Sequence, residues 1–134
     1  LRLLHYPPQD TDQSGGGCGA HTDYGCFTLL MTDENSGLEI RNLDGAWVAV
    51  PPAGSDYIVN IADLMQRWTN DLYRSTPHRV TNLGGRDRYS VPFFFNPNPE
   101  AVIASLDRNG EGRYPPVKAR DYSLQRYRTA YGGA

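Results

Sequence analysis

The chain has 134 residues, a formal net charge of −2 and 39% hydrophobic residues. This length and hydrophobic content predict one compact domain over residues 1–134, and the lack of any block of like charges argues against nucleic acid or an anionic membrane as partner. No apolar run approaches the roughly 18 residues of a membrane span, and no signal peptide is evident. The absence of blocks of like charge makes a small molecule the expected partner. Two cysteines, Cys18 and Cys26, are too few for a disulfide framework, so we expect a cytoplasmic protein.

Short strand-like segments separated by Gly, Pro and Asn dominate the chain. In chain order we predict strands at 1–6, 26–31, 37–42, 45–50 and 56–61, a helix at 62–70, strands at 77–82 and 89–95, and a helix at 120–131. Strand spacing of about 8 to 12 residues favours a β-sandwich or barrel over alternating strands and helices. The segments "TLLM" and "PFFF" are apolar on both faces, which predicts strands that are covered on both sides.

Each helix has a candidate cap. Asp63 is expected to cap the first helix, and Asp121 to cap the second, which carries an apolar stripe at Leu124, Tyr127 and Tyr131.

The glycine-rich stretch "GGGCG" at 15–19 raises the question of a phosphate-binding loop. It lacks the Lys-Ser/Thr that completes such a loop, and strand-like sequence follows it instead of a helix. We therefore interpret it as a permissive loop that leads into the next motif.

That motif is His21 and Asp23, two residues apart. On an extended strand both side chains leave the same face and can share one metal ion. His78 lies on a separate predicted strand that a small barrel can fold back beside the first. Two imidazoles and one carboxylate would form a facial triad typical of non-haem Fe(II) oxygenases, with zinc as the competing ion. The spacing alone is equally compatible with His21 and His78 as ordinary half-buried polar residues.

Arg88 and Ser90 are also two residues apart and can hold a carboxylate together, the guanidinium as a fork and the hydroxyl as a further donor. This interpretation implies a dicarboxylate ligand whose other end faces the metal. The alternative is a solvated arginine at a hairpin end, beside Arg86 and Asp87. No Gly-x-Ser-x-Gly motif surrounds Ser90, which argues against a hydrolase.

Several motifs together resemble one family. The segments "LLHYPP", "HTDYGCFTLL", "GLEI", "GAWVAVPP", "IVNIAD", "WTNDLYRSTPHRV" and "RYSVPFFFNP" follow one another from residue 1 to about residue 97. In this order they resemble the Fe(II) and 2-oxoglutarate-dependent dioxygenases, in the subgroup that includes isopenicillin N synthase and plant oxidases of flavonoid and gibberellin metabolism.

The resemblance implies a mainly β fold, a double-stranded β-helix or jelly roll with a short helix and a C-terminal helix. It implies that Fe(II) is bound by His21, Asp23 and His78. It also implies that 2-oxoglutarate, the cosubstrate, is bound by Arg88, Ser90 and Tyr6. Leu30 and Phe94 are candidates for lining the substrate pocket, with core packing as the alternative. One departure is Leu4, where many plant members carry Asn.

The implied function is an oxygenase that uses O₂ to hydroxylate, desaturate or cyclise a small organic substrate and releases succinate and CO₂. Two alternatives remain: an isopenicillin N synthase-like oxidase without 2-oxoglutarate, and an inactive jelly-roll binding domain. We also expect the family's N-terminal helical region to be absent, and with it the cover of one sheet, so that the chain can self-associate through the uncovered sheet.

Overall fold

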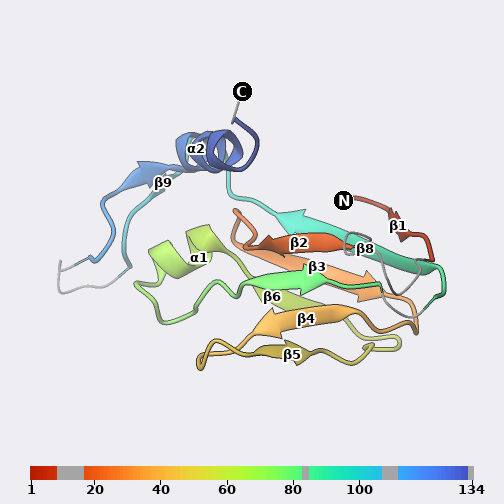
Figure 1. Cartoon of the computed structure of the whole chain (residues 1–134). Helices are drawn as coiled ribbons and strands as arrows, with labels where there is room; N and C mark the ends of the chain where they lie inside the picture. The colour runs from red at the N-terminus through yellow and green to blue at the C-terminus, as the bar shows by residue number, and fades with distance from the viewer. Residues whose placement is uncertain (9–16, 83–84, 107–111, 133–134) are drawn as a thin grey trace. The chain divides into compact units, whose positions relative to one another are not determined.

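The computed structural model describes residues 1–8, 17–82, 85–106 and 112–132 (Figure 1). Within these ranges the elements are, in chain order, β1 (Leu4–Tyr6), β2 (Cys18–His21), β3 (Phe27–Thr32), β4 (Leu38–Arg41), β5 (Trp47–Ala49), β6 (Ile58–Ile61), α1 (Asp63–Trp68), β7 (His78–Val80), β8 (Arg88–Phe95), β9 (Val102–Ile103), β10 (Val117–Lys118) and α2 (Ala119–Tyr131). The predicted strands and both helices are present. β2 ends at His21, where an extended strand was expected, and β9 and β10 are additional.

The first eight strands form two four-stranded sheets, with strand orders β1-β8-β3-β6 and β2-β7-β4-β5. β1 pairs with β8, β2 with β7, and β4 with both β5 and β7, all antiparallel. Strands from opposite ends of the series are thus neighbours, which is the connectivity of a jelly roll. The predicted mainly β, double-stranded β-helix fold is confirmed.

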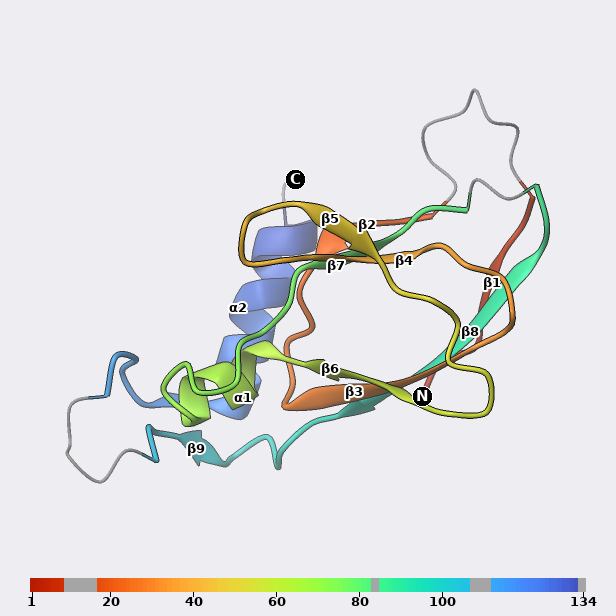
Figure 2. The same ribbon diagram turned by 90° about the horizontal axis from the view of Figure 1, so that it is seen from below.

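Contacts divide the chain into two units. The first comprises Leu1–Thr22, Leu29–Asn60 and Thr76–Phe93, and the second comprises Asp23–Thr28, Ile61–Ser75 and Phe94–Ala134. The first unit contains most of both four-stranded sheets, which Figure 2 shows as two opposing layers.

Side chains alternate between the two faces of β8. Arg88 and Ser90 are buried, whereas Tyr89 and Phe93 are 53% and 43% exposed. On β3, Met31 is 41% exposed. The prediction that the "TLLM" and "PFFF" strands are covered on both faces is therefore wrong for the described residues, because strand alternation sends every second apolar side chain outward. Self-association through this face stays a prediction.

The second unit has its own small core. Leu64, Ile103 and Ala119 are buried together, and Trp68, Val117 and Tyr122 pack against them. Among the residues that the structure describes, no helix is long and apolar enough to cross a membrane.

The predicted helix caps are wrong. The N-caps are Ala62 and Lys118, and neither forms a side-chain cap hydrogen bond. Asp63 and Asp121 lie in the first turns instead. The apolar stripe of α2 is also not buried by the described residues, since its members are 52%, 49% and 79% exposed (Leu124, Tyr127 and Tyr131).

The glycine-rich stretch ends sooner than predicted. Residues 15 and 16 lie outside the described residues, and β2 already begins at Cys18, so the loop prediction is wrong for residues 18 and 19. Position 17 has no room for a side chain, because a Cβ there would overlap the Val80 carbonyl oxygen of β7.

Candidate active site

His21 and His78 lie side by side because β2 pairs with β7. The two residues are register partners, and their ring centroids are 4.3 Å apart with the ring planes at 55°. Ile40 of β4 is also a register partner of His78. Since directly opposed residues share one face of a sheet, both imidazoles lie on the same face as Ile40.

A backbone carbonyl fixes each imidazole. His21 Nδ1 lies 2.7 Å from the Gly19 oxygen, and His78 Nδ1 lies 3.0 Å from the Thr76 oxygen. A carbonyl oxygen only accepts, so Nδ1 carries a hydrogen in both rings, and a neutral ring in this tautomer has its lone pair at Nε2. This is the arrangement in which a histidine binds a metal through Nε2.

Asp23 does not lie on a strand. β2 ends at His21, and Asp23 follows in the connection between β2 and β3, so the expectation that both residues share one extended strand is wrong. The carboxylate is 7% exposed and accepts a hydrogen bond of 2.6 Å from the Thr28 hydroxyl. The Asp63 N–H of α1 donates to the Asp23 carbonyl oxygen at 2.9 Å. Because the first N–H groups of a helix have no intrahelical acceptor, the start of α1 binds this connection.

His21, Asp23 and His78 each offer one ligand atom, and the three atoms lie within 4.8 Å of one another. Thr22 alone separates the first two residues in the sequence. Two imidazole nitrogens and one carboxylate oxygen match the donor set of a 2-His-1-carboxylate site, which suits Fe(II) and also zinc.

Tyr6, Arg88 and Ser90 form a second polar group, where β1 pairs with β8. Tyr6 is the register partner of Arg88, and Leu4 that of Ser90. The Arg88 Cζ atom lies 5.1 Å from the centroid of the Tyr6 ring. Burial raises the pKa of the Tyr6 phenol, and the hydrogen bond with Ser90 and the charge of Arg88 only partly offset that rise. Tyr6 is therefore a neutral donor at physiological pH.

Arg88 is 1% exposed, so the alternative of a solvated arginine at a hairpin end is wrong. Its Nε and Nη1 atoms are buried and have no hydrogen-bond partner among the described residues. A buried cation without a counter-charge is unfavourable, because burial removes the solvent that stabilises it. The arrangement therefore suits an anion that approaches the guanidinium.

The remaining predicted residues lie on the apolar strands. Leu30 on β3 is 8% exposed, and Phe94 on β8 is half-buried. These values fit both pocket lining and core packing. Two polar residues had not been singled out from the sequence, Thr28 beside Asp23 and Asn82 near Tyr6. Both are 4% exposed or less. Their burial, which is known only from the structure, is what distinguishes them from other Thr and Asn residues.

The model of the 2OG-Fe(II) oxygenase superfamily matches residues 1–97. The chain belongs to this superfamily. A curated relative from Emericella nidulans, the 2-oxoglutarate-Fe(II) type oxidoreductase hxnY, is 46% identical over 142 aligned residues, which cover 100% of this chain and 41% of the relative. The chain thus spans well under half the length of that superfamily member.

Solved structures of similar proteins have the same fold over nearly the whole of this chain. A full-length Neurospora crassa protein in complex with alpha-KG and thymine has a TM-score of 0.88 at 33% identity, over 96% of this chain and 43% of that one. JOX2 in complex with 2OG, Fe and JA has a TM-score of 0.82 at 32% identity, over 92% and 38% of the two chains.

Proposed function

We propose that the chain is the catalytic core of a non-haem Fe(II), 2-oxoglutarate-dependent oxygenase that oxidises a small organic substrate with O₂ and releases succinate and CO₂. The observation that carries the proposal is the group of His21, Asp23 and His78, with three ligand atoms within 4.8 Å of one another. Membership of the 2OG-Fe(II) oxygenase superfamily supports iron over zinc as the ion.

In this proposal, His21 and His78 bind Fe(II) through Nε2, and Asp23 binds it through its carboxylate. The Nδ1 hydrogen bonds to Gly19 and Thr76 keep both rings in the required tautomer. An Fe(II) ion held by these three side chains would still be able to bind small molecules, which suits a 2-His-1-carboxylate site.

We propose that Arg88, Ser90 and Tyr6 bind the distal carboxylate of 2-oxoglutarate. Arg88 Nε and Nη1, which have no hydrogen-bond partner among the described residues, support this role, because a carboxylate would accept hydrogen bonds from them. Ser90 and the neutral Tyr6 phenol each add a hydroxyl donor. In the proposed site, Leu30 and Phe94 exclude water from the reacting centre.

Bound Fe(II) and 2-oxoglutarate supply the redox chemistry that activates O₂ and oxidises the substrate. This chain's own residues hold the ion, orient the cosubstrate and shield the site. Thymine in the Neurospora crassa complex and JA in the JOX2 complex are small organic molecules, which supports a substrate of that class here.

Cys18 and Cys26 are both thiols, which supports our proposal of a reducing, cytoplasmic compartment.

The test uses anaerobic protein, Fe(II) and 2-oxoglutarate. The proposal predicts one 2-oxoglutarate per Fe(II) and a visible charge-transfer band. His78→Ala should abolish iron binding and the band. His5→Ala is the control for iron binding, because His5 is exposed and pairs with Asp87 instead of a member of the triad, and it should leave iron binding unchanged.

The alternatives give different results. Iron binding without 2-oxoglutarate uptake or succinate release would support an isopenicillin N synthase-like oxidase and contradict the proposal. A His78→Ala variant that binds ligands as the parent does would support a binding domain with an incidental metal group.

A further inference from the structure

We infer that Asn82 is a positioning residue for the proposed 2-oxoglutarate site, because its side-chain amide fixes Tyr6 relative to Arg88. The inference rests on the proposed function, and it assigns a role to a residue outside the metal ligands and the proposed carboxylate donors. Asn82 lies two residues beyond the end of β7 and is 4% exposed.

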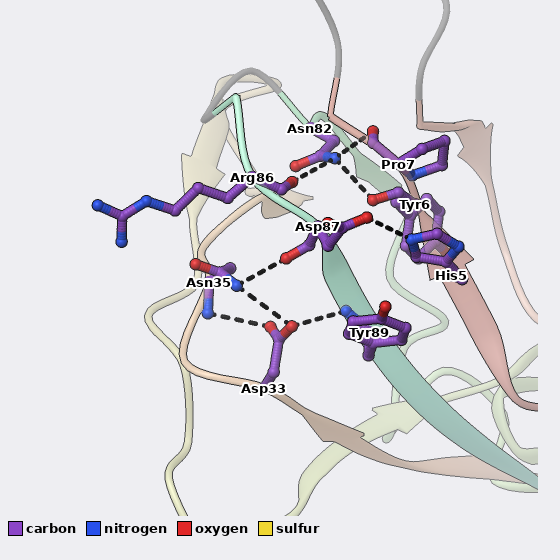
Figure 3. Close-up of polar contacts among 9 residues, drawn as sticks. All are labelled: His5, Tyr6, Pro7, Asp33, Asn35, Asn82, Arg86, Asp87 and Tyr89. Carbon is purple, nitrogen blue, oxygen red and sulfur yellow. Dashed lines mark hydrogen bonds and ion pairs between the residues drawn. The ribbon is translucent and has the colours of Figure 1, made fainter.

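The Asn82 amide joins two separate segments of the chain. Its Nδ2 atom donates to the carbonyl oxygens of Tyr6 at 2.9 Å, Pro7 at 2.8 Å and Arg86 at 3.1 Å (Figure 3). An amide nitrogen carries only two hydrogens, so at least one of them is shared between two acceptors. All three acceptors are backbone groups, and Asn82 therefore fixes the course of the main chain.

The joined segments are those that carry the proposed carboxylate donors. Tyr6 supplies both a carbonyl to Asn82 and the phenol that lies beside Arg88. Arg86 precedes Arg88 by two residues. Asn82 thus holds the end of β1 and the start of β8 at a fixed separation.

β1 needs this support because it is a short edge strand. It has three residues, and β8 is its one partner among the described strands. Pro7 follows β1 and has no N–H with which to extend the ladder. The Asn82 amide supplies hydrogen bonds to Tyr6 and Pro7 where the ladder ends, so the position of the Tyr6 phenol depends on Asn82.

A second network holds the same turn without reaching Tyr6. Asn35 donates to the Asp87 carbonyl at 2.8 Å, and Asp33 accepts from the Tyr89 N–H at 2.7 Å (Figure 3). Asn35 is therefore the matched control, since it too is an amide that binds a carbonyl of the residues before Arg88, but none of its hydrogen bonds in Figure 3 goes to β1.

The experiment compares two ligands that differ in one group. 2-Oxoglutarate has a distal carboxylate, and 2-oxobutanoate lacks it. Affinities are measured under anaerobic conditions with Fe(II), from the visible band, for the parent chain, Asn82→Ala and Asn35→Ala. Misplacing Tyr6 and Arg88 affects only the ligand that reaches them, whereas a general loss of folded protein affects both ligands equally.

We expect Asn82→Ala to bind 2-oxoglutarate about tenfold more weakly, the equivalent of one to two hydrogen bonds, and to bind 2-oxobutanoate with a change of about twofold or less. Asn35→Ala should change neither affinity by more than about twofold. Asn82→Ser keeps one donor in a smaller side chain and should fall between the parent and Asn82→Ala. Adding Tyr6→Phe to Asn82→Ala should cost less than the sum of the two single effects, because both act through the same phenol.

An unchanged ratio of the two affinities in Asn82→Ala would overturn the inference. If that variant does not fold, an unchanged ratio in Asn82→Ser has the same meaning. A parent chain that binds Fe(II) but shows no preference for 2-oxoglutarate would contradict the proposed function instead, so the two failures are distinguishable.

Discussion

The Thr28 hydroxyl donates a hydrogen bond of 2.6 Å to the Asp23 carboxylate, and both side chains are buried, at 2% and 7% exposed. Thr28 lies on β3, whereas Asp23 lies in the connection that precedes it. The hydrogen bond engages Oδ2, so β3 sets the orientation in which the carboxylate meets an ion.

Replacing Thr28 by Val should lower the affinity for Fe(II) by roughly 10-fold to 100-fold, because Val keeps the shape but removes the donor that orients the ligand. Thr32→Val is the control on the same strand. The Thr32 hydroxyl is buried and has no partner within the described ranges, so its removal should leave iron affinity unchanged and stability equal or higher. Anaerobic iron titration against a chelator measures the affinities, and urea denaturation measures the stability. Equal iron affinities in the two variants would contradict the role of Thr28.

Gly37→Ala should destabilise the fold by about 2 kcal/mol or more, through backbone strain and a steric clash. Gly37 has a φ of +139°, and a Cβ there would overlap the Thr81 carbonyl oxygen and lie 3.4 Å from Arg88 Nε. Gly19→Ala is the control, because a Cβ at Gly19 meets nothing within 4 Å. Urea denaturation midpoints should fall for the first variant only.

Asp63→Asn should destabilise the second unit by about 1 to 3 kcal/mol, because it removes the charged acceptor of a partly buried hydrogen-bond network. Its carboxylate accepts hydrogen bonds from Ser75 at 2.7 Å and Tyr122 at 2.9 Å, and pairs with Arg126 at 3.2 Å. Asp121→Asn, at an exposed position on α2, should change the free energy of unfolding by about 0.5 kcal/mol or less. Thermal denaturation of the two variants tests the difference, and matching midpoints would be inconsistent with this network.

Acid should weaken the fold through Asp71. A hydrogen bond from Tyr114 lowers the Asp71 pKa below its ordinary value of 3.8, aided by Gln66 and Arg113. A lowered carboxyl pKa contributes stability that is present above the unfolded-state pKa and is lost as the pH falls through the folded-state value. Asp71→Asn should therefore be less stable than the parent at pH 7, and the difference should shrink below pH 3.8.

Urea denaturation across this pH range, with the exposed Asp44→Asn as control, measures the Asp71 effect. A stability difference that stays constant down to acid pH would rule out the lowered pKa as its cause.

The strands could be predicted from the sequence because short apolar or alternating segments between turn residues are typical of β-sandwich and barrel folds. The pairing of His21 with His78 was also expected, since two antiparallel strands place distant residues opposite each other. The position of Asp23 was harder to predict. Local spacing suggested an extended strand, but β2 ends at His21 and the Asp23 carbonyl accepts a hydrogen bond from α1.

The roles of Thr28 and Asn82 were not predictable from local sequence. Asn82 binds three backbone carbonyls, two of them more than seventy residues away, and backbone carbonyls leave no pattern in a sequence. The exposed faces of β3 and α2 were missed for a related reason, because apolar composition indicates a preference for burial but not which segment supplies it.

The strand pairing also bears on when the site can form during folding. Tyr6 and Arg88 meet where the first strand of the jelly roll pairs with the eighth, and His21 and His78 meet where the second pairs with the seventh. The β1–β8 ladder closes the longest loop of the eight-strand series, and the β2–β7 ladder also joins residues that are far apart in the sequence. Such long-range pairings are the slowest to form. A partly folded chain therefore lacks both the imidazole pair and the buried guanidinium, so recovery of metal binding should report completion of folding.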